Sequence, residues 1–166
     1  MGAGKSTVGP LVARRLGWAF IDLDDEIEAE AGATVPAIFA SRGEAAFREA
    51  ERAAAERVCT RESLVLATGG GAFTMPDTRR ALKRGALTVW LRCELDTLLG
   101  RIPTDGSRPL AANRATIGPL LTGREPSYAL ADLTVDTTRR PPDETARIIA
   151  EAASGGGVEG GGTTAG

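Results

Sequence analysis

The chain has 166 residues, of which 42% are apolar and 25% are charged, and its formal net charge at pH 7 is -2. This composition fits one soluble globular domain that can bury a proper core. Scattered arginines, the absence of histidine and only two cysteines exclude a polyanion-binding tail, a zinc site and a cysteine–histidine nucleophile. The apolar runs are short and broken by charge, so we expect neither a signal peptide nor a membrane span, and predict a cytoplasmic protein that binds no nucleic acid.

Strand-like runs and helical segments alternate along the chain, which predicts right-handed crossovers and a parallel sheet covered on both faces. The fold class is therefore α/β, a three-layer α/β/α sandwich. Ligands in such sheets gather at the carboxyl ends of the strands. The predicted strands are residues 19–23, 64–68, 86–91 and 133–136, and the predicted helices are residues 5–16, 25–31, 35–40, 44–61, 76–84, 94–101, 115–130 and 143–153.

The N-terminal stretch "MGAGKSTVG" contains the second half of a phosphate-binding loop, G-x-x-x-x-G-K-[ST]. Lys5 is expected near the β- and γ-phosphates and the Ser6 hydroxyl on a magnesium ion. The first glycine of the pattern, and the strand that feeds it, would lie before Met1, so we expect one strand to be missing from this chain. A flexible glycine-rich N-terminus ahead of a helix is the alternative interpretation.

The stretch "FIDLDDEI" ends the first predicted strand with Asp22 and Asp24. With a strand period of two, both side chains would point to the same side, about 7 Å apart. One carboxylate could then reach a magnesium ion while the other acts as general base for a substrate hydroxyl. The alternative is that one aspartate caps the helix that starts near Asp25.

The stretch "GEAAFREAE" places Arg48 and Glu51 three residues apart on one helix face. This spacing is typical of a solvated ion pair, and it also builds an arginine clamp for a carboxylate. The run Gly69, Gly70 and Gly71 follows a strand directly, which suggests that the backbone approaches a phosphate or a substrate ring closely.

The segment "GRIPTDGSRPL" contains Arg101 and Arg108. It can be a surface loop, or a lid around residues 102–114 that folds Arg108 over the transferring phosphate and excludes water. The glycine-rich residues 154–166 are predicted to be a disordered tail that follows a single domain of residues 1–153.

These motifs, in this order, resemble those of the shikimate kinases, a branch of the nucleoside-monophosphate-kinase-like P-loop fold. The matching stretches are "GAGKST", "DLD", "FREAE", "GGGA", "RPL" and "VDTTRRPP", and the resemblance runs from Met1 to about Arg140. It implies ATP- and Mg²⁺-dependent phosphorylation of the 3-hydroxyl of shikimate, on the route to chorismate. In this fold the strand that enters the phosphate loop is central, so the strand missing from this chain would be the central one.

The resemblance also assigns roles to residues of this chain. The triphosphate of ATP would lie against the phosphate loop and first helical turn, comprising Gly2, Ala3, Gly4, Lys5, Ser6 and Thr7. Lys5, Asp24 as the base and Arg108 would be catalytic, Ser6 and Asp22 would serve Mg²⁺, and Arg101 would lie near adenine. Shikimate would be held by Asp24, by the carboxylate clamp of Arg48 and Arg124, and by Gly69, Gly70 and Gly71 along its ring.

Two other functions fit parts of the pattern. The first is another small-molecule kinase of the same fold, such as a gluconate or adenylate kinase, although the two arginines and the glycine wall favour a small carboxylated polyol. The second is a truncated, catalytically weak relative that binds nucleotide or serves as a partner subunit. We expect a monomer whose partners are shikimate and ATP.

Overall fold

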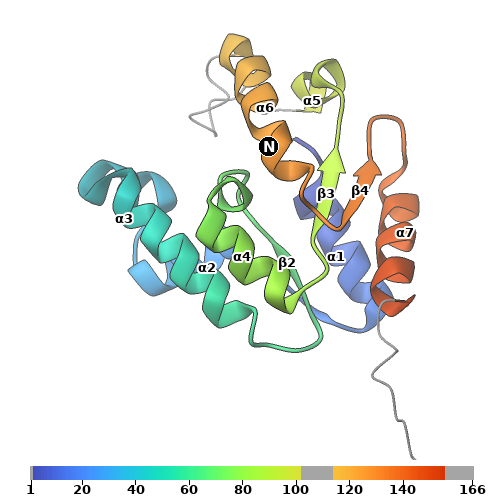
Figure 1. The fold of residues 1–166 in the computed structure, drawn as a ribbon, viewed down its shortest axis with the longest axis horizontal. Helices are drawn as coiled ribbons and strands as arrows, with labels where there is room; N and C mark the ends of the chain where they lie inside the picture. The colour runs from blue at the N-terminus through green and yellow to red at the C-terminus, as the bar shows by residue number, and fades with distance from the viewer. Residues whose placement is uncertain (1, 102–113, 156–166) are drawn as a thin grey trace, which may run out of the picture.

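The computed structural model describes residues 2–101 and 114–155 of the chain. Within these ranges the elements alternate as the sequence predicts (Figure 1). The predicted lid with Arg108, apart from its last residue, and residues 156–166 of the predicted tail lie outside the described residues. The elements in chain order are α1 (Lys5–Leu16), β1 (Ala19–Asp22), α2 (Leu23–Ala31), α3 (Val35–Val58), β2 (Leu64–Ala67), η1 (Ala72–Thr74), α4 (Pro76–Gly85), β3 (Val89–Arg92), α5 (Leu95–Arg101), α6 (Arg114–Tyr128), β4 (Leu133–Asp136) and α7 (Pro142–Gly155).

The strands form two separate parallel pairs. β1 pairs with β2, with Ala19 opposite Leu64, and β3 pairs with β4, with Val89 opposite Leu133. Among the described residues no strand bridges the two pairs, so β2 and β3 each have a strand neighbour on one side only. The parallel pairing of both strand pairs agrees with the prediction.

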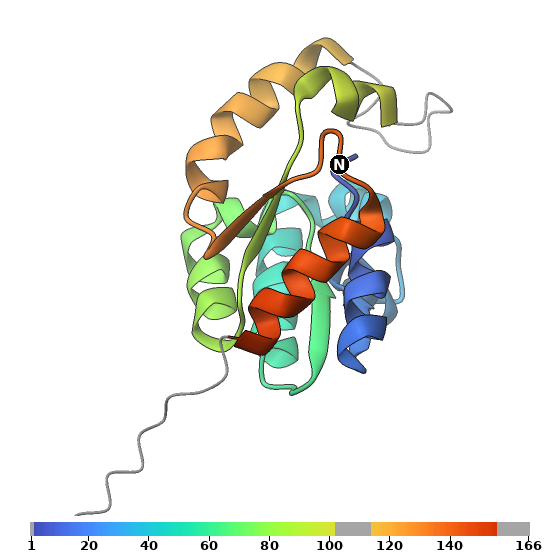
Figure 2. The same cartoon turned by 90° about the vertical axis from the view of Figure 1, so that its right-hand side faces the viewer.

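Helices cover both faces of the strands, which gives three layers (Figure 2). On one face, α1 and α7 pack with alternate strand residues such as Val65, Val89 and Val135 around a core centred on Val8 and Val12. On the other face, α2, α3 and α4 form a second core that includes Leu64 and Leu66 of β2. The alternation of β2 side chains between the two cores is the period-two pattern of a strand buried on both faces.

Several element ends differ from the predictions. The third strand begins at Val89 and not at residue 86. Ahead of it, both the backbone N–H and the hydroxyl of Thr88 donate to the Asp132 carboxylate, at 2.9 and 2.6 Å, and this non-local contact fixes the residues before the strand. The two helices predicted at 35–40 and 44–61 are joined in α3 with a break at Gly43, whose φ of 78° and ψ of 174° are not helical. α7 extends to Gly155, two residues beyond the predicted end of the domain at residue 153.

The carboxyl ends of the strands are the end of the molecule where chemistry is expected. α5 and α6 lie beyond the ends of β3 and β4, and the N-terminal residues lie beside them (Figures 1 and 2). In the described parts of the chain no helix is both long and apolar enough to cross a membrane.

Candidate active site

The N-terminus of α1 is one half of the site. Gly4 precedes the helix with a φ of 100°, a left-handed conformation that glycine adopts without strain, and its carbonyl accepts from Thr7 N at 3.0 Å and Val8 N at 2.7 Å. No side chain caps the helix start. An uncapped helix N-terminus that carries Lys5 and Ser6 in its first turn has N–H groups and positive charge suited to phosphate.

The loop after β4 joins this half of the site. The Thr137 hydroxyl donates to the Ala3 carbonyl at 3.3 Å and to the Arg92 carbonyl at 3.0 Å. Arg101, at the end of α5, donates to the carbonyls of Thr137 and Thr138 at 2.8 and 3.2 Å. Arg101, predicted to lie near adenine, is therefore tied to the loop after β4, which also contacts Ala3 near the start of the chain.

The strand-period argument for Asp22 and Asp24 is wrong, because β1 ends at Asp22 and α2 begins at Leu23. Asp22 is the N-cap of α2, and its Oδ1 accepts the Asp24 N–H at 3.1 Å. Asp24 therefore lies in the first helical turn, not on the strand. The capping role left open for one of these aspartates belongs to Asp22.

The second half of the site is organised by an ion pair on α3. Arg48 Nη1 donates to Glu51 Oε2 at 2.8 Å, and Nη2 contacts Glu44 at 3.2 Å. The Glu51 side chain is 1% exposed and that of Arg48 is 20% exposed. A buried carboxylate that fixes a partly exposed guanidinium orients the remaining N–H groups of the arginine for an acceptor.

The three glycines after β2 lie where the other groups of this half converge. A methyl group at Gly69 would be 3.3 Å from Asp24 Oδ1 and 3.4 Å from Glu51 Oε1. At Gly70 it would be 2.9 Å from Arg124 Nη1 and 3.0 Å from the Tyr128 hydroxyl, and at Gly71 it would be 2.7 Å from Arg48 Nη2. The glycines thus allow close approach of three helices to one stretch of backbone.

α6 contributes Arg124 and Tyr128, four residues apart on one helix face. The Tyr128 hydroxyl donates to the Gly70 carbonyl at 2.6 Å, and its ring lies against Trp90 with centroids 5.9 Å apart. We predicted no role for Tyr128. Its spacing from Arg124 was the available signal, and only the fold shows that it holds the glycine run.

The carboxylates of this half titrate abnormally. Burial raises the pKa of Asp24, and the nearby Asp22 raises it further, while Lys5 lowers it. Burial also raises the pKa of Glu51, although Arg48 opposes the shift. The electrostatic effect of Lys5 on Asp24 links the phosphate half of the site to the glycine half.

The residues predicted to bind Mg²⁺ are Ser6 and Asp22, and both offer side-chain oxygen atoms, which this ion prefers as ligands. One carboxylate oxygen of Asp22 caps α2, and the other takes no part in that cap. Within residues 2–101 and 114–155 no group of three or more acidic, cysteine or histidine side chains could hold a metal by itself.

Comparison with known proteins settles the family. A family profile described as "Shikimate kinase" matches residues 1–154. The chain belongs to the shikimate kinase family. The family predicted from the ordered motifs is thereby confirmed, together with the α/β class of its fold.

Individual relatives agree. The shikimate kinase of Moorella thermoacetica is 46% identical over 154 residues, which are 92% of this chain and 89% of that protein. The shikimate kinase of Paramagnetospirillum magneticum is 44% identical over 154 residues, which are 91% of this chain and 79% of that protein.

Solved structures of shikimate kinases superpose on the chain as well. The enzyme from Acinetobacter baumannii in complex with shikimate gives a TM-score of 0.87 at 37% identity, covering 96% of this chain and 91% of that one. The enzyme from Aquifex aeolicus gives a TM-score of 0.78 at 32% identity, and the match covers 93% of this chain and 92% of that one.

Proposed function

We propose that this shikimate kinase transfers the γ-phosphoryl group of ATP to the 3-hydroxyl of shikimate. The observation that carries the proposal is the convergence of Asp24, Arg48 and Arg124 on Gly69, Gly70 and Gly71. This arrangement places two cations and one carboxylate around a wall without side chains, which suits a small ring that bears both a carboxylate and hydroxyls. Membership of the family and the neighbour solved with shikimate support the same substrate.

Asp24 is the proposed general base. Burial raises the pKa of Asp24, which makes its carboxylate a stronger proton acceptor than an ordinary aspartate. As the substrate oxygen attacks the γ-phosphorus, its proton passes to Asp24, the bond to the bridging β–γ oxygen breaks, and ADP leaves. Lys5 is proposed to neutralise charge on the transferred group from the start of α1.

Arg48 and Arg124 are the proposed clamp for the shikimate carboxylate. The ion pair with Glu51 fixes the Arg48 guanidinium before substrate arrives, so little side-chain freedom is lost on binding. Arg124 lies at Gly70, the glycine between the one that faces Asp24 and the one that faces Arg48. Two guanidinium groups facing one carboxylate give both affinity and a fixed ring orientation.

For the nucleotide, the proposed contacts are residues 2–7, Arg101 and the lid residue Arg108, which lies outside the described residues. Ser6 and Asp22 would hold Mg²⁺, which would supply positive charge to offset that of the phosphates. A cytoplasmic location and a monomeric state stay predictions.

The test is acceptor-dependent ADP release by the purified protein with ATP and Mg²⁺. We expect ADP release that depends on shikimate, a phosphorylated product bearing the group at the 3-position, and no reaction with gluconate. The variants Lys5→Met and Asp24→Asn should each lose at least about 10²-fold in rate, with shikimate binding retained in Lys5→Met. Release that is equal with gluconate, or near-normal turnover of Lys5→Met, would contradict the assignment.

A further inference from the structure

Arg48 is held by two carboxylates in very different surroundings. The Glu51 side chain is 1% exposed, and its Oε2 accepts from Arg48 Nη1 at 2.8 Å. The Glu44 side chain is 68% exposed, and its Oε1 accepts from Nε at 3.3 Å and from Nη2 at 3.2 Å. The Glu51 bond is short and shielded from water, whereas the two Glu44 bonds are long and reached by water. We therefore expect the Glu51 pair to persist and the Glu44 pair to open readily.

The two nitrogens that Glu44 holds form a carboxylate-binding edge of the guanidinium. Arginine binds a carboxylate with two parallel N–H bonds, through either its Nε–Nη2 edge or its Nη1–Nη2 edge. In Arg48, Nη1 is bonded to Glu51, and both Nη1 and Nη2 lie against Gly71, where a methyl group would be 2.7 Å from Nη2. The Nε–Nη2 edge is therefore the more open of the two, and one Glu44 oxygen accepts from both of its nitrogens.

The break in α3 places Glu44 within reach of this edge. Gly43 has a positive φ of 78°, so Glu44 begins the second helical segment, and Arg48 follows one turn later. The i, i+4 spacing brings their side chains to one helix face. Because Glu51 and Gly71 fix the guanidinium while the Glu44 side chain is exposed, Glu44 can withdraw and Arg48 cannot follow it.

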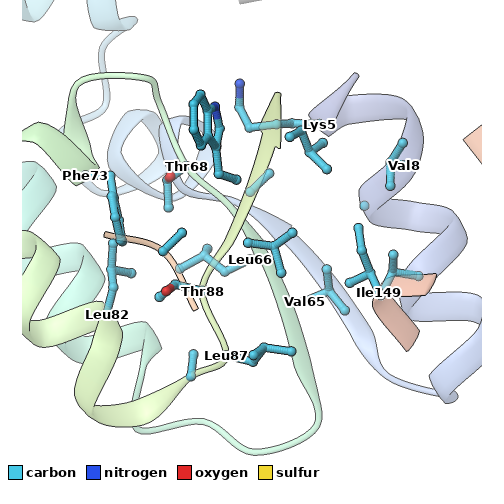
Figure 3. Close-up of a pocket in the computed structure, with 18 of the residues that line it drawn as sticks. Lys5, Val8, Val65, Leu66, Thr68, Phe73, Leu82, Leu87, Thr88 and Ile149 are labelled. Carbon is cyan, nitrogen blue, oxygen red and sulfur yellow. The ribbon is translucent and has the colours of Figure 1, made fainter. Parts of the chain in front are cut away.

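The edge lies apart from the large cavity of the structure. That cavity has a volume of about 900 Å³, with Lys5 at its upper end and Leu87 at its lower end in the view of Figure 3. Arg124 is one of the residues that line it, whereas Arg48 and Glu44 are not. The two arginines of the proposed clamp thus differ in their surroundings, and the Arg48 edge is reached past an exposed glutamate.

We propose that Glu44 is an internal competitor of the substrate carboxylate: it occupies the Nε–Nη2 edge of Arg48 and is exchanged for the carboxylate of shikimate as the substrate binds. The inference rests on the proposed clamp of Arg48 and Arg124. The exchange replaces one ion pair by another, so the guanidinium keeps a partner throughout and shikimate affinity is lowered by the strength of the Glu44 pair. The phosphorylated product keeps the carboxylate, so the return of Glu44 favours its release as well.

The test is equilibrium titration with shikimate, without ATP, of the wild type and of Glu44→Asp and Glu44→Ala. Aspartate keeps the charge but is one methylene shorter, and contacts that are already 3.2 and 3.3 Å long leave it out of reach of a fixed guanidinium. We expect both variants to bind shikimate about two- to fivefold more tightly than the wild type, the range that an exposed ion pair contributes. The Kd for ATP should not change.

The matched control alters another ion pair of the same helix. Glu49 pairs with Arg52 at i, i+3, and its side chain is also 68% exposed. Glu49→Asp and Glu49→Ala should leave the Kd for shikimate unchanged. A matched ligand is the methyl ester of shikimate, which lacks the negative charge needed to displace Glu44, so its Kd should be the same in the wild type and in both Glu44 variants.

Three results would overturn the inference. An unchanged Kd in both Glu44 variants would mean that there is no competition for Arg48. Weaker binding in both would make Glu44 a second support of the arginine, like Glu51. Tighter binding by Glu44→Ala alone would reduce the effect to the loss of one negative charge near the site.

The titration and the turnover assay separate this inference from the proposed function. The expected order of Kd values in a protein without shikimate-dependent ADP release would uphold the inference and remove the proposed function. Shikimate-dependent ADP release together with equal Kd values in all variants would do the reverse. A wild-type protein that binds no shikimate would contradict both.

Discussion

The Glu51 carboxylate, almost completely buried, accepts a 2.8 Å hydrogen bond from Arg48, whose guanidinium lies against the backbone of Gly71. Glu51 thus orients the guanidinium of Arg48, the proposed partner of the substrate carboxylate, and is a positioning residue. The hydrogen bond from Arg48 explains why an acidic side chain is tolerated in the core between α3 and the glycine run. Four of the predictions below concern groups that meet at this run.

Replacing Arg48 or Glu51 should separate shikimate binding from ATP binding. Arg48→Ala removes one charged partner of the substrate carboxylate and should weaken shikimate by about 2–5 kcal/mol. Glu51→Gln keeps the shape and one acceptor, so we expect roughly a tenfold rise in the KM for shikimate with a smaller change in kcat. Separate titrations with shikimate and ATP check both, and equal weakening of the two ligands would mean that the pair only holds the fold.

Gly71→Ala should act through the same guanidinium. The new methyl group would lie 2.7 Å from Arg48 Nη2 and 2.8 Å from Cζ, so Arg48 has to move. We expect a loss on the order of 10²-fold in kcat/KM for shikimate with the KM for ATP unchanged. Gly100→Ala is the matched control, because a methyl group there meets nothing within 4 Å. Equal kinetics of the two variants would contradict a close approach at Gly71.

Tyr128→Phe removes the hydroxyl that donates to the Gly70 carbonyl. We expect the free energy of unfolding to fall by about 1 kcal/mol, together with a severalfold loss of kcat/KM for shikimate, because the glycine run loses its anchor. Ser41→Ala is the control, since it deletes an exposed hydroxyl bond to the Ala37 carbonyl at 2.7 Å away from the site. Denaturant unfolding and steady-state kinetics measure the two effects, and a variant that loses stability alone would leave Tyr128 a purely structural role.

The pH dependence of activity should report Asp24. A base must be deprotonated to act, so kcat/KM should fall as pH drops through the pKa of Asp24, which burial raises above the ordinary value. The exposed Asp25 also raises this pKa, so Asp25→Asn should move the acid limb to lower pH while the plateau rate is kept. The control Asp77→Asn on α4 should leave the limb in place. An unmoved limb in Asp25→Asn would assign the titration to another group.

Stability in acid should depend on Asp132. Hydrogen bonds from Lys83 and Thr88 lower its pKa from 3.8 to about 2. A depressed carboxyl pKa stabilises the fold above the unfolded value, and this contribution is lost as pH falls from about 4 to about 2. The Tm difference between the wild type and Asp132→Asn should therefore be largest near pH 7 and should shrink as the pH falls from about 4 to about 2. A difference that is constant down to about pH 2 would contradict the linkage.

Local patterns in the sequence determined the family, the helices and most of the residues that meet at the site. The predicted helix over residues 5–16 is confirmed as α1, with Gly4 and Gly17 at its ends, and the i, i+3 spacing of Arg48 and Glu51 predicted their ion pair. These features depend on neighbours a few residues away, so sequence alone contains them.

Contacts between distant residues decided the rest. Asp22 became a helix cap because β1 stops one residue earlier than its apolar pattern suggests, and β3 starts late because Asp132 binds Thr88 from 44 residues away. The meeting of Asp24, Arg48, Arg124 and Tyr128 at three glycines depends on the packing of α2, α3 and α6 around one strand end. The division of the described strands into two parallel pairs is likewise set by non-local hydrogen bonds, which no local pattern encodes.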